Sequence, residues 1–68
     1  MEKYTVKQAR LLSGISIKKM AKELGMSPSG YRNKEIGRSD FYYHEAVKLS
    51  AIVGIPIEKI IFFTEEVA

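Results

Sequence analysis

The sequence contains no cysteine, no tryptophan and a single histidine, His44. Without cysteine the chain can form neither a disulfide nor a thiolate metal site, so its 68 residues must be stabilised by packing or by a partner subunit. One histidine leaves a transition metal with little besides carboxylates as ligands. We therefore expect no metal and no other cofactor, and the lack of cysteine fits the reducing cytoplasm.

Long apolar runs and catalytic patterns are missing as well. No run approaches the roughly 20 apolar residues that span a bilayer, and the stretch MEKYTVKQAR has no apolar signal core. No serine is matched with a histidine and an acid in a nucleophile pattern, and no paired carboxylate supports His44 as a catalyst. These absences predict a cytoplasmic protein that is not an enzyme, with no membrane and no small-molecule ligand among its partners.

What the sequence does contain is an uneven distribution of charge. Residues 1–38 carry nine Lys and Arg against three Glu, a net charge of +6, whereas residues 39–68 carry two Lys against five acidic residues, a net charge of −3. A basic half beside an acidic half suggests a surface that faces a polyanion. A solvated helical surface of mixed charge is the alternative, and charge alone does not separate the two.

Helix start and stop residues recur along the chain, and no segment alternates between apolar and polar residues as a strand would, so β structure should be minimal. Thr5 and Gln8 match a capping box, and Val6, Ala9 and Leu12 follow at helical spacing on one face. The pattern predicts five helices: one between Thr5 and Gly14, then Ser16–Leu24, Ser27–Ile36 and about Tyr42–Val53, and a last one that Pro56 opens.

The segment SPSGYRNKEIG, residues 27–37, follows an amphipathic helix after a short turn that contains Gly25. Two short helices joined by such a turn are typical of a helix-turn-helix, in which the second helix enters the major groove of DNA. A groove-facing helix needs short polar side chains on its outer side, with donors and acceptors for base edges. The segment offers such side chains at Ser27, Ser29, Arg32 and Asn33.

The aromatic residues near this segment have different expected environments. Tyr31 is the one large residue that turns inward from the third predicted helix, so it is expected in the core and not as a stacking platform. Tyr42, Tyr43 and His44 are consecutive, so they cannot share one helix face. We expect Tyr43 to be partly buried and the other two to be exposed.

The order and spacing of several residues extend the helix-turn-helix interpretation over nearly the whole chain. They are Arg10, GIS at 14–16, MAKELGMS at 20–27, Glu35, Gly37 and EAVKLSAIVGIPIEKIIF at 45–62. Through these residues the chain resembles the Cro/repressor-type, Xre-like helix-turn-helix regulators of phages and bacteria, and the stretch from Tyr31 to Phe41 looks like a sub-type frequent in phage-related proteins. The resemblance implies an all-α fold, a compact five-helix bundle of the lambda-repressor-like kind, in a single DNA-binding domain over residues 1–68.

The resemblance also implies roles for individual residues. Arg10 and Glu35 match a pair that joins the first helix to the end of the third by a salt bridge. The base-facing positions are Pro28, Ser29, Arg32 and Asn33, with Arg32 suited to guanine or to a phosphate and Asn33 to adenine. The positions near phosphates, which place the protein on DNA but do not read the sequence, are Ser16, Ile17, Lys18, Ser27, Arg38 and Tyr43.

Some residues depart from the family pattern. Ile17 stands where glutamine usually begins the second helix, so the chain has no side-chain amide to offer DNA there. Pro28 and Gly30 leave few base-reading groups on the third helix. Tyr42 stands where serine or threonine usually caps the fourth helix, so residue 39 or 40 is expected to cap a slightly earlier start.

The C-terminal stretch IIFFTEEVA is apolar at its beginning. Ile60 can close the core, but one short helix cannot hide the apolar residues that follow, and exposed apolar clusters mark interaction surfaces. Residues 61–68 are therefore expected either to fold back over the bundle or to form a dimer interface. The dimer hypothesis places Ile57, Ile61, Phe62 and Phe63 in that interface.

These observations predict a sequence-specific DNA-binding transcriptional regulator of phage or prophage repressor type. Two copies on a two-fold axis would present two recognition helices about 34–36 Å apart to a pseudo-palindromic operator, so a homodimer is expected. At this length we expect no effector domain, and control would come from protein concentration or from a separate partner. The alternative is a protein-interaction module, an antitoxin- or inhibitor-like subunit, with weak or secondary DNA binding.

Overall fold

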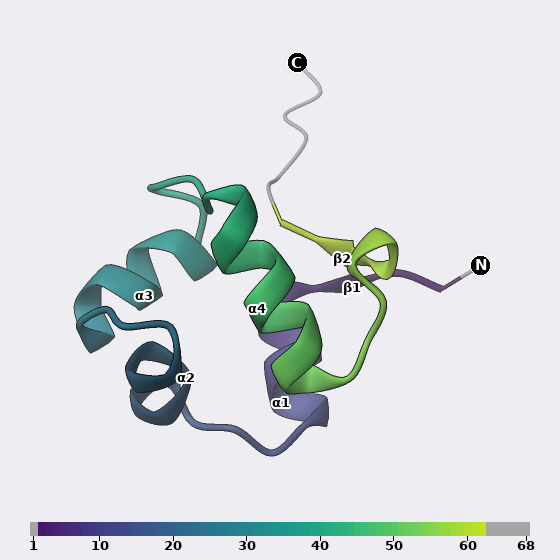
Figure 1. The fold of residues 1–68 in the computed structure, drawn as a ribbon, viewed down its shortest axis with the longest axis horizontal. Coiled ribbons are helices and arrows are strands. Elements are labelled where there is room, and N and C mark those ends of the chain that lie inside the picture. The colour runs from purple at the N-terminus through teal and green to yellow at the C-terminus, as the bar shows by residue number, and fades with distance from the viewer. Residues whose placement is uncertain (1, 63–68) are drawn as a thin grey trace.

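The computed structural model describes residues 2–62 and consists mainly of helices (Figure 1). None of the helices in this part of the chain is long and apolar enough to cross a membrane. The α-helices are α1 (Val6–Leu12), α2 (Ile17–Glu23), α3 (Pro28–Glu35) and α4 (Tyr43–Val53). A 3-10 turn, η1 (Ile57–Lys59), and two short strands, β1 (Tyr4–Thr5) and β2 (Ile60–Ile61), complete the described part.

The all-helical class predicted from the sequence holds, but residues 2–62 contain four α-helices, and the fifth helix predicted from Pro56 onward is wrong. After one turn at η1 the chain extends into β2, which pairs in parallel with β1 and places Ile60 opposite Tyr4. The extended backbone brings the side chain of Ile60 into the core, where the residue is only 6% exposed. The backbone groups that follow η1 pair with the N-terminal segment, which satisfies hydrogen bonds that a longer helix would otherwise have provided.

Side-chain caps fix where the first three helices begin. Thr5 Oγ1 accepts a hydrogen bond from the Gln8 amide at 3.1 Å, and the Thr5 amide donates to Gln8 Oε1 at 2.9 Å, which confirms the capping box of α1. The hydroxyls of Ser16 and Ser27 each accept a hydrogen bond at 3.1 Å from the amide three residues later, so they cap α2 and α3 as predicted.

The start of α4 differs from the expectation that residue 39 or 40 would cap it. Tyr42 is the N-cap residue, and its amide donates to Glu45 Oε1 at 2.9 Å. Glu45 therefore supplies the acidic half of a capping box, and its negative charge is favourable beside the positive end of the helix dipole.

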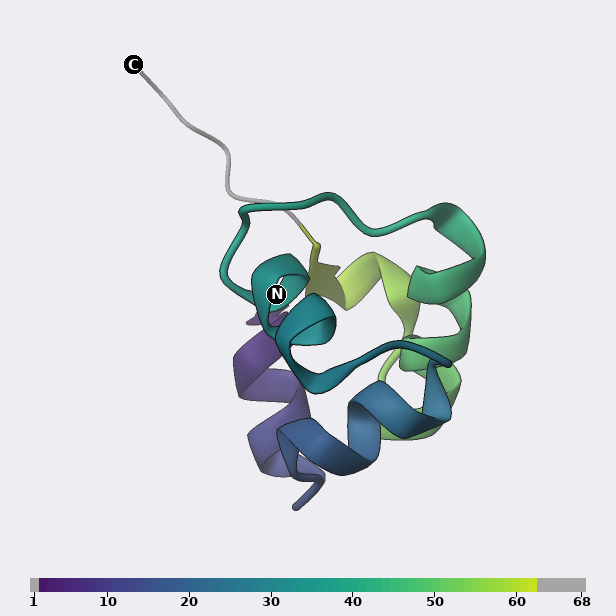
Figure 2. The ribbon, with the colours of Figure 1, turned by 90° about the vertical axis from the view of Figure 1, so that its left-hand side faces the viewer.

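The turn between α2 and α3 depends on Gly25, whose φ of 73° lies in the left-handed region. Across this turn the Met26 amide donates to the Ala21 carbonyl at 2.9 Å, which satisfies a carbonyl at the end of α2. The chain can therefore change direction within a few residues. Figure 2, which faces the left side of Figure 1, shows α2 and α3 next to each other.

Tyr31 lies at the centre of the core and is fully buried, which confirms the inward orientation predicted for it. Phe41 meets the Tyr31 ring edge-on with centroids 6.3 Å apart, and Phe62 meets Phe41 in the same way at 5.4 Å. The aromatic rings thus extend the core toward the C-terminal segment. The other buried members of this core are Val6, Met20, Ala21, Leu49 and Ile60.

Two residues predicted to face inward are exposed instead. The exposed fraction is 67% for Leu12 and 78% for Tyr43. Leu12 is the last residue of α1 and Tyr43 is the first residue of α4. Val6 also stands at a helix end and is buried, so it is the packing of neighbouring elements that decides which of these terminal side chains reach the core.

Candidate nucleic-acid interface

The polar side chains of α3 lie on the surface, as a groove-entering helix requires. Pro28, Ser29 and Arg32 are exposed, and Asn33 is half-buried. On the opposite side of the helix, Tyr31 is fully buried and attaches α3 to the core. The structure therefore brings the four residues predicted to face bases onto one helix whose outer side carries no large apolar group except the proline ring.

Gly30 lies in the first turn of α3, beside the cap. A Cβ atom at this position would lie 3.0 Å from Ser27 Oγ, and the same oxygen caps the helix by accepting from the Gly30 amide at 3.1 Å. The cap itself does not require glycine, because Gln8 and Lys19 donate the equivalent bonds in α1 and α2. Glycine instead removes side-chain bulk from the N-terminal turn of α3.

The residues predicted near phosphates lie around this helix. Ile17 is half-buried and packs against the core, so its side chain cannot replace the glutamine amide that is usual at this position. The other five are exposed: Ser16, Lys18, Ser27, Arg38 and Tyr43.

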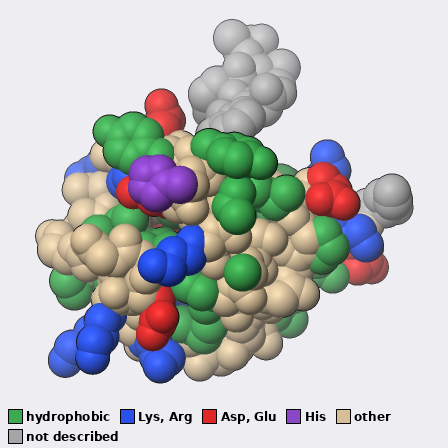
Figure 3. Space-filling view, viewed as in Figure 1, with side chains coloured by type: hydrophobic (Ala, Val, Ile, Leu, Met, Phe, Trp, Pro, Cys, Tyr) green, Lys and Arg blue, Asp and Glu red, His purple; other side chains and the backbone are tan. Residues whose placement is uncertain are grey.

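The exposed side of α2 is basic. Its lysines line a shallow hollow of about 260 Å³. Figure 3 shows Lys and Arg side chains gathered at the lower left, around α2. Positive charge next to α3 is what a helix-turn-helix needs, because the first helix of the motif crosses the phosphate backbone. The hollow is lined by Ser16, Lys18, Lys19, Lys22 and Glu23.

A buried ion pair joins α1 to the last turn of α3. Arg10 Nε donates to Glu35 Oε2 at 2.8 Å, and Arg10 Nη2 donates to Glu35 Oε1 at 3.3 Å. Only 7% of the Arg10 side chain and 4% of the Glu35 side chain are exposed. Arg10 Nη1 donates to the Ile15 carbonyl at 2.8 Å, and the Tyr31 hydroxyl donates to Glu35 Oε2 at 2.6 Å. The salt bridge implied by the family resemblance is therefore present, and it fixes α3 to α1 and to the segment before α2.

The contacts of this network set its charge state. Burial opposes the negative charge of Glu35, but hydrogen bonds from Arg10 and Tyr31 outweigh burial and hold the pKa of Glu35 below its usual value. The hydrogen bond to Glu35 raises the pKa of Arg10. Burial, and then the hydrogen bond to Glu35, raise the pKa of the Tyr31 hydroxyl. At neutral pH the network is thus a charged pair with a neutral phenol that donates to the carboxylate.

A second ion pair, which the sequence analysis did not single out, joins the end of α3 to the start of α4. Lys34 Nζ lies 2.6 Å from Glu45 Oε1, and it also lies over the Tyr42 ring at 4.5 Å from the centroid. Burial opposes ionisation of Glu45, but hydrogen bonds from Lys34 and from the Tyr42 amide hold its pKa below the usual value. The one signal in the sequence was an acid at the third position of a helix whose cap is not a serine or threonine.

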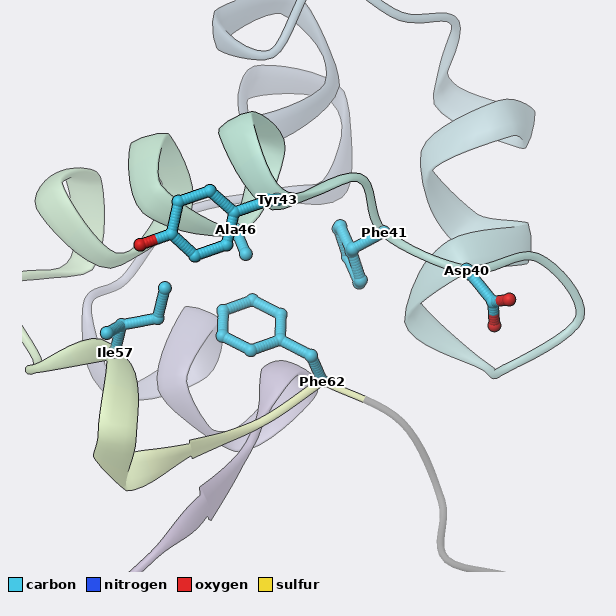
Figure 4. Close-up of a pocket in the computed structure, with 6 residues that line it drawn as sticks. All are labelled: Asp40, Phe41, Tyr43, Ala46, Ile57 and Phe62. Carbon is cyan, nitrogen blue, oxygen red and sulfur yellow. The ribbon is translucent and has the colours of Figure 1, made fainter.

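The C-terminal part of the described chain forms one wall of a groove of about 270 Å³. Figure 4 shows the ring of Phe62 between Ile57 and Phe41, with Tyr43 on the opposite wall. Of the residues predicted in a dimer interface, Ile57 and Phe62 are half-buried here, Ile61 is 41% exposed, and Phe63 lies outside the described residues. The groove is lined by Asp40, Phe41, Tyr43, Ala46, Ile57 and Phe62.

The arrangement of α2, a short glycine turn and an outward polar α3 defines a helix-turn-helix protein. A family model of helix-turn-helix proteins matches residues 6–60, so the chain belongs to the helix-turn-helix family of Cro and Xre type. This is a family of DNA-binding transcriptional regulators. No curated protein and no solved structure gives a significant match to the chain.

Proposed function

We propose that this regulator is a sequence-specific repressor of phage or prophage type, which acts in the cytoplasm as a homodimer on a pseudo-palindromic operator. The observation that carries the proposal is the outward polar face of α3 opposite the buried Tyr31. A helix held in this way can enter a major groove without moving the core.

Binding would combine two kinds of contact. Lysines of α2 and Arg38 would neutralise phosphates and provide most of the affinity, which makes binding dependent on salt. Arg32 would donate to guanine and Asn33 to adenine, whereas Ser29 is short enough to let the backbone approach the bases. Because few of these side chains read bases, one copy would discriminate only modestly.

A homodimer would improve the discrimination between sequences. Two copies related by a two-fold axis place two recognition helices one turn of DNA apart, about 34–36 Å. The apolar groove beside Phe62 and the exposed Ile61 supports an interface on this side of the molecule, because an exposed apolar cluster gains free energy when a partner covers it. Sedimentation or light scattering of the intact chain, compared with Ile61→Ser, would test the assembly: the intact chain should be a dimer, and the variant, changed at an exposed side chain, should be a monomer.

The DNA-binding proposal is tested with two substitutions that should act differently. Arg32→Ala should cost about 1–3 kcal/mol at the preferred sequence and change the sequence preference, measured by selection from random duplexes. Lys18→Ala should weaken binding to all duplexes alike and reduce the slope of log affinity against log salt by about 0.9.

Lys59→Ala is the matched control, because Lys59 is exposed in η1, away from α2 and α3 in Figure 1. It should leave both the preference and the slope unchanged. If neither Arg32→Ala nor Lys18→Ala alters binding, the proposed orientation on DNA is wrong.

A second candidate function, a protein-interaction module, is favoured by the surface of α1. Leu11 and Leu12 are 58% and 67% exposed, and with Tyr4 and Gln8 they line an open hollow of about 370 Å³. Such a surface fits a partner protein. Titration with duplex DNA at two salt concentrations separates the two functions: binding that weakens steeply with salt supports the repressor, and no binding at low salt supports the interaction module.

A further inference from the structure

The connection between α3 and α4, residues 36–42, carries or adjoins two of the residues proposed to contact phosphates. Arg38 lies within it, and Tyr43 directly follows it; both are exposed. Tyr43 borders the groove beside Phe62 but is 78% exposed, so packing alone does not fix its side chain. Their positions relative to α3 therefore depend on what holds the two ends of the connection.

The first end is tied to α3 by the backbone. The amides of Arg38 and Ser39 both donate to the Asn33 carbonyl, at 2.8 and 3.2 Å. The chain therefore leaves α3 in a defined direction, next to a residue proposed to face bases.

The second end is held by Glu45 and Lys34. One carboxylate oxygen, Glu45 Oε1, accepts from the Tyr42 amide at 2.9 Å and from Lys34 Nζ at 2.6 Å. The same ammonium group lies 4.5 Å from the centroid of the Tyr42 ring, and that ring stacks on His44 with centroids 5.9 Å apart. The last turn of α3 is thus fastened to the first turn of α4 by a charged group with contacts on two sides.

We propose that Lys34 and Glu45 are positioning residues of the DNA interface. Their ion pair sets the spacing between α3 and the start of α4, so that Arg38 and Tyr43 meet phosphates when α3 lies in the major groove. Neither of the pair needs to touch DNA, since only 15% of the Lys34 side chain and 11% of the Glu45 side chain are exposed. This inference rests on the proposed DNA binding. It adds an explanation of how the phosphate contacts of Arg38 and Tyr43 are kept at the right distance from α3.

Glu45 makes the proposal testable because its charge and its positioning role predict opposite results. A negative charge close to a DNA-binding surface repels phosphates, so its simple removal should strengthen binding. If Glu45 acts through its ion pair with Lys34, loss of its charge should instead weaken binding. Glutamine at this position removes the charge but can still accept from the Tyr42 amide, as Gln8 accepts from the Thr5 amide in α1.

The decisive variant is Glu45→Gln, titrated with duplex DNA over a range of salt concentrations. We expect affinity to fall about tenfold, which corresponds to about 1.4 kcal/mol, and the salt slope to shrink by about 0.9 for each phosphate that the variant no longer neutralises. Glu58→Gln is the matched control, since Glu58 is an exposed acid in η1 with the same charge change. It should bind DNA as tightly as the unmodified chain or slightly more tightly.

Stability is measured in parallel, because Glu45 also caps α4. Each titration is done at a temperature where circular dichroism shows the variant to be fully folded. A stability effect alone would leave the salt slope unchanged under these conditions, so the slope separates positioning from folding.

Variants of Lys34 complete the test. Lys34→Arg can pair with Glu45 and lie over Tyr42, so it should bind within about threefold of the unmodified chain, whereas Lys34→Met should lose affinity. The double variant Lys34→Met with Glu45→Gln should lose no more than the single variant with the larger loss, because both changes break the same ion pair.

The outcomes distinguish the positioning role of Lys34 and Glu45 from DNA binding itself. If the unmodified chain binds duplex DNA and Glu45→Gln behaves like Glu58→Gln, the positioning role is wrong and the proposed function stands. Additive losses in the double variant would likewise overturn it. If the unmodified chain does not bind duplex DNA at low salt, the proposed function fails, and this inference fails with it.

Discussion

Two ion pairs hold the last turn of α3, and they differ in burial and in what they connect. Arg10 and Glu35 join α3 to α1 with 7% and 4% of their side chains exposed, and the Tyr31 hydroxyl and the Ile15 carbonyl complete their hydrogen bonds. Lys34 and Glu45 join the same turn to α4 near the surface, with 15% and 11% exposed.

The difference shows that two attachments of one short helix can have separate roles: one sets the orientation of the helix, and the other sets its distance from the next helix. A buried pair with most of its hydrogen-bonding groups satisfied holds one orientation, because removal of either partner leaves a charge in the interior. A pair nearer water contributes less to folding but still fixes a distance between two helix ends. We infer that the Arg10–Glu35 pair holds α3 in its orientation on the fold. The Lys34–Glu45 pair then sets where Arg38 and Tyr43 lie relative to α3.

The largest expected effect comes from the buried pair. Arg10→Met should lower the free energy of unfolding by about 3–5 kcal/mol, because Glu35 would remain buried without its cation. A domain of this size has a total stability of only about 3–10 kcal/mol, so the variant should be largely unfolded or close to it. Chemical denaturation followed by circular dichroism measures the change.

The matched control is Arg38→Met, which makes the same change at an exposed arginine. Its unfolding free energy should stay within about 0.5 kcal/mol of that of the unmodified chain. Equal losses in the two variants would show that the buried pair is no more important for folding than a surface charge.

Acid should produce a smaller loss through the same group. The pKa of Glu35 is lowered in the folded chain, so its contribution to stability is present above the unfolded pKa of about 4.3 and is lost as pH falls through the folded value. The unfolding free energy should therefore decline below about pH 5. Denaturation curves between pH 3 and 7 measure this decline.

The acid experiment also compares the two pairs, since the pKa of Glu45 is lowered too. Glu35→Gln should remove more of the pH dependence than Glu45→Gln, because hydrogen bonds are what lower these pKa values, and Glu35 accepts three of them whereas Glu45 accepts two. A larger change in Glu45→Gln would reverse the ranking of the two pairs.

Between the cations of the two ion pairs, Lys34 should matter less for folding than Arg10, and Lys34→Met tests this. Its unfolding free energy should fall by about 1 kcal/mol or less, because Glu45 keeps its hydrogen bond from the Tyr42 amide and lies close to water. Thermal or chemical denaturation tests this. A loss as large as that of Arg10→Met would mean that both pairs serve mainly to keep the chain folded.

Much of the fold was predictable because its signals are local. The capping box at Thr5 and Gln8, the serine caps of α2 and α3, and the inward Tyr31 each depend on residues a few positions apart. The outward polar face of α3 was predictable for the same reason, since helical spacing decides which side chains share a face.

Apart from the cap of α4 and the exposure of Leu12, the errors fall where distant segments meet. The stretch after Pro56 resembles the start of a helix, but it becomes β2 because Tyr4 is there to pair with Ile60. The exposure of Tyr43 and the partnership of Lys34 with Glu45 depend on the path of the chain between α3 and α4. No local pattern specifies that path.

The amino-acid sequence by itself determined the class of this protein: where its first three helices begin, which residues of α3 turn inward, and which small polar residues remain outside. These follow from hydrogen bonds and side-chain periodicity within single elements. Only the tertiary structure decided the number of α-helices, the pairing of the two short strands, and the second attachment of α3. Those features join residues from separate elements, and their free energy arises only after the chain has brought the partners together.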